Sequence, residues 1–225
     1  MVVIMKKNKL LSLFFALLLL MPVLPGCSGD NNPTPGATDS AYPIIISEIM
    51  SSNRTTITDE DGDYVDYIEL YNGGKVRVNL KDCYLSDDPD RPQQYKLPSL
   101  YLEPGQYLVL FASGKNKSNF AKGIFHTNFK ISSQGETITL TGPEGQVICS
   151  VQMPPSIPDV AYGCVLSGEQ KGQYMWFAEG MPGRRNTSAY APSIDELTFD
   201  TVTLYINEYM TKNTYTLYDE EGDYS

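Results

Sequence analysis

The chain has 225 residues, of which 41% are hydrophobic and 20% charged, and its formal net charge is −10 at pH 7. These values are typical of a globular protein with a substantial core. Nucleic acids and anionic membranes attract proteins through clustered lysine and arginine. An acidic chain is therefore not expected to bind either of them through charge, and we predict no nucleic-acid partner.

Residues 1–26 have the three parts of an export signal. Three lysines precede an apolar helix-forming run at residues 10–20, and Cys27 follows at the expected distance. A membrane-spanning anchor is the alternative, but the uncharged run is short for a span and contains Pro22 and Pro25. The pattern favours a cleaved signal peptide.

The residues Leu24, Pro25, Gly26 and Cys27 resemble the lipobox of bacterial lipoproteins. The resemblance implies cleavage between Gly26 and Cys27 and attachment of a diacylglyceryl group to the Cys27 sulfur. Each buried acyl CH₂ would contribute about 0.8 kcal/mol to membrane binding. Removal of three lysines and no acidic residue would change the net charge from −10 to −13. We therefore expect an extracytoplasmic protein, lipid-anchored to the cell membrane or cell surface, with the membrane as a partner through Cys27.

After the signal, the chain divides by composition into four segments. Residues 27–41 are polar and rich in proline and glycine, which predicts a disordered tether. Residues 42–187 are predicted to form one ordered domain. Residues 188–203 are predicted to be a linker, and residues 204–225 to begin a second domain.

The prediction of a second domain rests on an internal repeat. Residues 206–225 align without a gap to residues 46–65, and ten of the twenty pairs are identical. A repeat of this kind indicates a duplicated structural unit. Because the second copy stops at Ser225, we expect it to be truncated. The identical pairs include Glu48/Glu208, Asn53/Asn213, Asp59/Asp219, Gly62/Gly222 and Tyr64/Tyr224.

Within the predicted domain the apolar pattern is short and has a period of two residues, which is typical of β-strands. Glycine and proline turn signals separate these segments. The pattern predicts an antiparallel sandwich or barrel. The expected strands are residues 44–49, 67–71, 76–80, 106–111, 136–140 and 146–151.

Seven motifs appear in a characteristic order along about 145 residues. They are IxEIM at 46–50, DYIELYN at 66–72, YLSDD at 84–88, LEPGQYLVL at 102–110, HTNF at 126–129, GET at 135–137 and PGRRN at 182–186. Together they resemble the bacterial lamin-tail domain, and the lipobox makes the whole chain similar to a lipoprotein that carries this domain. The resemblance implies an all-β fold, an immunoglobulin-like antiparallel β-sandwich. Cys83 departs from the family, which often has tryptophan at that position.

The densest acidic cluster contains Asp59, Asp61, Asp63 and Asp66. Carboxylate oxygens at alternating positions around a glycine turn are suitable Ca²⁺ ligands. The EF-hand spacing fails, however, because Gly62 follows Asp61 directly. A solvated acidic turn is the favoured interpretation, and a calcium site is the alternative. No other cofactor is predicted.

No catalytic residue is predicted, and the chain is not expected to be an enzyme. His126 has no accompanying nucleophile motif, and the family resemblance implies a structural loop there. Glu48 and Glu69 lie within apolar strands, where a place on an outward face is favoured over a catalytic acid–base pair.

The three cysteines after Cys27, which are Cys83, Cys149 and Cys164, leave two arrangements open. One disulfide with one free thiol is possible, and three buried free thiols are equally plausible. A zinc site is not expected, because no two of these cysteines have the C-x₂₋₄-C spacing.

These observations favour a non-catalytic, lipid-anchored module for adhesion, tethering or spacing, with a cell-surface protein or glycan as partner. In a second hypothesis the chain is the delivery arm of a larger surface enzyme, with a kinase-like or hydrolase domain beyond residue 225. In a third hypothesis it is a calcium-dependent carbohydrate-binding module.

Overall fold

The computed structural model describes residues 42–199. The predicted signal peptide, its cleavage site at Gly26 and Cys27, the predicted tether and the predicted second copy lie outside these residues. Within residues 42–199, no helix is long and apolar enough to cross a lipid bilayer.

The described residues form short β-strands and a single turn of 3₁₀ helix, η1, at Ile194–Glu196. The strands are β1 (Ile44–Met50), β2 (Tyr67–Asn72), β3 (Val78–Asn79), β4 (Tyr84–Ser86), β5 (Tyr95–Lys96), β6 (Tyr101–Leu102), β7 (Tyr107–Phe111), β8 (Ser118–Asn119), β9 (Ile124–Phe125), β10 (Glu136–Thr141), β11 (Val147–Met153), β12 (Ala161–Cys164), β13 (Tyr174–Phe177) and β14 (Tyr190–Ala191).

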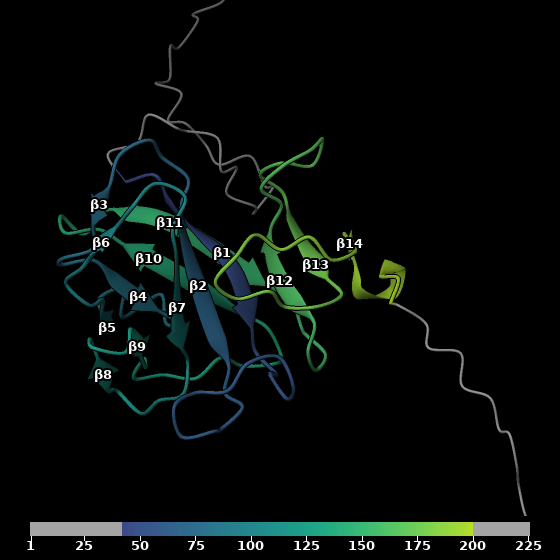
Figure 1. Ribbon diagram of the computed structural model, residues 1–225, viewed down its shortest axis with the longest axis horizontal. Helices are drawn as coiled ribbons and strands as arrows, with labels where there is room; N and C mark the ends of the chain where they lie inside the picture. The colour runs from purple at the N-terminus through teal and green to yellow at the C-terminus, as the bar shows by residue number, and fades with distance from the viewer. Residues whose placement is uncertain (1–41, 200–225) are drawn as a thin grey trace, which may run out of the picture. The chain divides into compact units, whose positions relative to one another are not determined.

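Two antiparallel sheets make up the body of the domain (Figure 1). The larger sheet has the strand order β14-β13-β12-β1-β2-β7, and the smaller has the order β11-β10-β4-β5. Two short ribbons, β3-β6 and β8-β9, accompany them. The expectation of an immunoglobulin-like antiparallel β-sandwich is confirmed.

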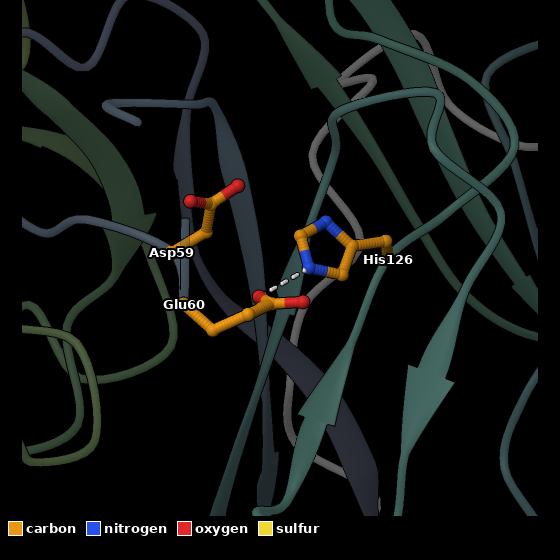
Figure 2. A group of neighbouring side chains, drawn as sticks. All are labelled: Asp59, Glu60 and His126. Carbon is orange, nitrogen blue, oxygen red and sulfur yellow. Dashed lines mark hydrogen bonds and ion pairs between the residues drawn. The ribbon is translucent and has the colours of Figure 1, made fainter. Parts of the chain in front are cut away.

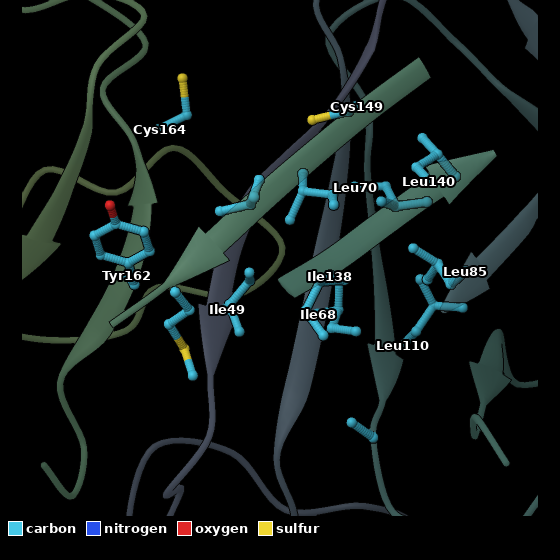
Figure 3. Close-up of a cluster of buried hydrophobic side chains, with 14 of the residues drawn as sticks. Ile49, Ile68, Leu70, Leu85, Leu110, Ile138, Leu140, Cys149, Tyr162 and Cys164 are labelled. Carbon is cyan, nitrogen blue, oxygen red and sulfur yellow. The ribbon is translucent and has the colours of Figure 1, made fainter. Parts of the chain in front are cut away.

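The main core lies between the two sheets. Figure 3 shows Ile49, Ile68, Leu70 and Leu110 of the larger sheet beside side chains of the smaller sheet, among them Ile138. All five of these side chains are fully buried. Apolar burial of this kind, at about 25 cal/mol per Å², is the main favourable contribution to folding.

An irregularity in β1 determines which face each side chain meets. The pairing with β2 shifts between Ile46 and Glu48, so Ser47 has no direct partner and forms a β-bulge. Ile46 and Ile49 therefore both reach the main core, and Glu48 turns to the opposite face. Gly163 on β12 lies against this bulge, where an added Cβ would come within 2.6 Å of the Ser47 carbonyl oxygen.

The opposite face of the larger sheet is also covered. A second apolar cluster on this outer face contains Met50, Tyr67, Phe111, Ala161, Val165, Met175 and Phe177. It alternates along the strands with the residues of the main core, as expected from the two-residue period. Much of both faces of this sheet is therefore buried, which differs from a sandwich sheet with one solvated face.

The ordered domain extends further than the sequence predicted. Residues 188–203 were expected to be a linker, yet β14 pairs with β13 and both Ala191 and Leu197 are buried in the main core. The prediction was wrong here because Pro192 and the small residues around it indicated a linker. They instead end a strand at the sheet edge, where proline is tolerated. Strands β12 and β13 were also missed.

Candidate functional site

The loop between β1 and β2 is held in shape by two side chains, Asn53 and Asp59. The Asn53 amide donates to the carbonyl oxygens of Ile57 and Val65, at 2.6 and 2.8 Å, and its oxygen accepts from the Thr56 amide. One Asp59 oxygen accepts from the amides of residues 61 and 63. Asn53 and Asp59 are among the residues that are identical in the sequence repeat.

Lys115 occupies the centre of the acidic cluster. Its Nζ lies 2.5 Å from Asp59, 2.8 Å from Asp61 and 3.0 Å from Asp63. Burial raises the pKa of Asp59, but the ammonium and two backbone donors outweigh it, so its pKa falls below the usual value. Hydrogen bonds from Lys115 and Lys117 lower the pKa of Asp61 to about 2.

Three of the four predicted calcium ligands are thus brought together, while Asp66 is not among them. The Asp66 carboxylate accepts hydrogen bonds from the backbone of Asn53 and Ile131, although burial has the larger influence and raises its pKa. The oxygens of Asp59, Asp61 and Asp63 lie within 4.8 Å of one another, close enough to share a cation. The Lys115 ammonium already supplies the positive charge between these carboxylates, so a Ca²⁺ ion would have to displace it.

A second chain of contacts joins the same loop to the end of β7. Glu60 accepts from Lys117 at 2.8 Å and contacts His126 Nε2 at 2.9 Å, as Figure 2 shows for the histidine. His126 Nδ1 lies 2.8 Å from the Ser113 hydroxyl. The hydrogen bond from Lys117, followed by that from His126, lowers the pKa of Glu60 to about 2.

A serine hydroxyl, an imidazole and a carboxylate in series are the parts of a nucleophilic triad. Here, however, His126 is fully buried, its ring is stacked on Phe111, and Ser113 is only 8% exposed. The Ser113 oxygen also accepts from the Lys115 amide at 3.1 Å. We interpret the contacts as structural, since they fasten the acidic loop to β7 and to the β9 region.

An open groove lies beside this loop, over side chains of β7. It is lined by Ile57, Tyr107, Val109, Phe111 and Ile124, together with Asp59 and Glu60. The larger sheet ends at β7, so part of this strand has no neighbouring strand within the described residues. The groove is a surface where a partner could contact the domain.

The second group of carboxylates lies beneath the segment from Gly180 to Asn186, which we call the strap. Glu48 of β1 and Glu69 of β2 are direct register partners, and they are 2% and 1% exposed. The sequence predicted the outward face of a half-buried strand for both, and the face is correct but the exposure is not. The β-bulge does place them opposite the main core, but the strap covers that face.

The strap binds both glutamates. The amide of Met181 and the side-chain amide of Asn186 donate to Glu48 at 3.0 and 2.7 Å, and the amide of Gly183 donates to Glu69 at 2.5 Å. The PGRRN motif therefore lies over β1 and β2 and forms hydrogen bonds to a glutamate of each strand. The motif itself was recognised from the sequence, but nothing in the sequence indicated that it contacts Glu48 and Glu69.

Burial changes the proton affinity of this pair. Desolvation is the main cause that raises the pKa of Glu69 to about 8, and the nearby Glu48 raises it further, while hydrogen bonds with Ser47 and Gly183 oppose the change. Burial also raises the pKa of Glu48, although hydrogen bonds from Tyr67, Asn186 and Met181 oppose the change.

The remaining residues considered from sequence have structural positions. Within residues 42–199, Cys83, Cys149 and Cys164 are buried and unpaired, which is the arrangement with three buried free thiols. Burial is the main cause that raises the pKa of all three. The role of Lys115 and Lys117 as counter-ions to the acidic loop was missed from the sequence.

Comparison with protein-family models identifies the family of this chain. The Lamin Tail Domain model matches residues 37–154, just over half of the chain. The chain belongs to the Lamin Tail Domain family. Comparison with curated proteins found no match. The matched region of the lamin tail domain contains the acidic loop, both glutamates and the His126 contacts, whereas the strap follows it.

Proposed function

We propose that this protein is a lipid-anchored, extracytoplasmic lamin tail domain that acts as a non-catalytic module for adhesion, tethering or spacing. The lipobox-like residues before Cys27 support the anchor. The fold alone names no ligand, since a sandwich of this kind can carry many functions.

The observation that carries the non-catalytic assignment is the use of the reactive side chains for internal contacts. Glu48 and Glu69 bind the strap, and His126 is held between Ser113 and Glu60. A general base or nucleophile must reach a substrate, and these groups are buried with their hydrogen-bonding capacity occupied.

The groove beside β7 supports a binding role. Edge strands can accept an additional strand from a partner, with hydrogen bonds from the main chain and contacts to alternate side chains. The partner that we propose is therefore a cell-surface protein that offers an extended segment.

Metabolic labelling with an alkyne-tagged fatty acid tests the anchor. The wild-type chain should be labelled and should partition into detergent, and Cys27→Ser should abolish both results. Cys83→Ser provides the matched control, because that thiol is buried in the domain and should not affect labelling. An unlabelled wild-type protein would refute the proposal.

A further inference from the structure

The hydrogen bonds around the two buried glutamates differ in kind. Glu48 accepts three of them, from the Tyr67 hydroxyl, the Met181 amide and the Asn186 amide. All three groups donate here, and a carboxylate that accepts several donors is favoured in its ionised form. The contacts therefore assign a negative charge to Glu48.

The contacts of Glu69 fit a protonated carboxyl group. One oxygen accepts from the Gly183 amide, and the other lies 2.7 Å from the Ser47 hydroxyl. The Ser47 hydroxyl also lies 3.2 Å from the backbone carbonyl oxygen of Glu69, to which it can donate. A proton on Glu69 can then be donated to the Ser47 oxygen, so that every polar atom has a suitable partner.

Two negative charges in this place would be poorly tolerated. The glutamates are adjacent on neighbouring strands and nearly inaccessible to water, and no lysine or arginine among residues 42–199 forms an ion pair with either. Like charges at close range in a buried site favour one shared proton.

We propose that the Glu48–Glu69 pair holds one proton, located on Glu69, and that this proton keeps the strap closed. Loss of the proton in alkaline solution releases the strap from the outer face of the larger sheet. The domain thus contains a pH-sensitive clasp at the junction of β1, β2 and the strap.

The other titratable groups near the pair do not take the place of Glu69 as the group that holds this proton. The Tyr67 hydroxyl donates a hydrogen bond to Glu48, and burial raises the pKa of Tyr67 well above the usual value. Burial also raises the pKa of Tyr107, which interacts electrostatically with both glutamates, to about 12. Two charged groups also interact electrostatically with these tyrosines. The exposed Arg185 of the strap lowers the pKa of Tyr107, and Asp159 raises the pKa of Tyr67.

The strap packs closely on the outer face of the larger sheet at Gly180. At Gly180 an added Cβ would lie 2.3 Å from the Tyr67 hydroxyl and 2.7 Å from the Met50 methyl group. Release of the strap would uncover Met50 and Tyr67, which belong to the outer-face apolar cluster and are fully buried when the strap is closed.

Trypsin digestion of the full chain between pH 6 and pH 9 tests the proposal. Arg184 and Arg185 in the strap are exposed, and so is Lys122 in the turn between β8 and β9, which serves as the internal reference. The rate of cleavage in the strap relative to Lys122 should rise about tenfold from pH 7 to pH 9, because the ionised fraction of Glu69 rises from about 0.1 to about 0.9.

The Glu69→Gln variant is the matched control, since its amide can donate to Ser47 as the protonated acid does and carries no titratable proton. Its relative cleavage rate should stay low and constant across this range. A rise in the variant equal to that of the wild type, or a constant ratio in the wild type, would overturn the proposal.

A second measurement needs no variant. The side-chain carboxyl carbon of Glu69 should have the NMR shift of a neutral acid at pH 6 and change to that of a carboxylate with a midpoint near pH 8. An ionised Glu69 at pH 6 would overturn the proposal. Constant fluorescence of Trp176, which is buried in the main core, would show that the sandwich stays folded.

Discussion

The acidic loop and the strap site both depend on carboxylates, yet they treat negative charge in opposite ways. In the loop, Asp59, Asp61 and Glu60 lie beside the ammonium groups of Lys115 and Lys117. At the strap, the donors that Glu48 and Glu69 meet within the described part of the chain are all neutral. The loop holds its acids ionised, and the strap site holds one of its acids protonated.

The comparison shows that the partner and the degree of burial decide the state of a carboxylate, not the residue type. Cationic partners at the loop lower the pKa of Asp61 and Glu60 to about 2. Burial without a cation raises the pKa of Glu69 to about 8. The two regions should therefore respond to mutation and to pH in opposite directions.

The largest effect is expected for Glu48→Ala. It leaves the Tyr67 hydroxyl, the Met181 amide and the Asn186 amide without an acceptor in a buried site. We expect a loss of about 3–5 kcal/mol in the free energy of unfolding. Urea unfolding followed by Trp176 fluorescence measures it.

The control for that change is Glu48→Gln, which retains one acceptor oxygen and should cost less than Glu48→Ala. If the two variants unfold at the same urea concentration, the hydrogen bonds to the strap do not stabilise the fold as we infer.

The pH dependence of stability is the next largest effect. Glu69 is neutral in the fold up to about pH 8 but ionises near pH 4.5 in the unfolded chain, so the stability it contributes is full below about pH 4.5 and is lost as the pH rises to about 8. The expected slope is at most about 1.4 kcal/mol per pH unit. Urea unfolding at several pH values should show this fall, and Glu69→Gln should reduce it.

The loop should produce the opposite trend at lower pH. Because the pKa values of Glu60 and Asp61 are about 2 in the fold, the stability they contribute is present above about pH 4.5 and is lost as the pH falls towards 2. Maximum stability is therefore expected near pH 4–5. A plateau from pH 5 to pH 8 in the wild type would contradict the comparison.

A smaller effect is expected for Lys115→Met. The Asp59 side chain is inaccessible to solvent and would lose its cation, which should cost about 2 kcal/mol. Lys117→Met is the matched variant, and because Lys117 pairs with the partly exposed Asp61 it should cost about 1 kcal/mol or less. Thermal melting of the two variants side by side measures the difference.

Calcium should give the smallest effect in the wild type. Since the Lys115 ammonium already contacts Asp59, Asp61 and Asp63, millimolar Ca²⁺ should leave the wild-type Tm nearly unchanged. In Lys115→Met the three carboxylates are free of that cation, and Ca²⁺ should raise the Tm. A clear increase in the wild type would instead support the predicted calcium site.

Much of the fold could be predicted because its signals are local. The two-residue period of β1, β2, β7, β10 and β11 and the turns between them indicate antiparallel strands without any knowledge of their partners. Strands β12 and β13 were missed because each is four residues long and fully buried. A short, continuously apolar strand has no alternation to detect.

The candidate site could be predicted only in part. The acidic cluster is contiguous in sequence, so its composition was visible, but Lys115 lies more than fifty residues away from it. The burial of Glu48 and Glu69 was mispredicted for a similar reason. Alternation correctly separates them from the main core, but only the chain that returns at residues 180–186 determines whether the other face is wet or dry.

The sequence by itself determined the export signal pattern, the repeat, the all-β character and the family motifs, because each depends on neighbouring residues or on fixed spacing. Tertiary structure alone decided which carboxylates meet a cation and which meet the strap. Charge and burial act through space, and segments more than a hundred residues apart, such as Glu69 and Gly183, set the proton affinity of one buried side chain.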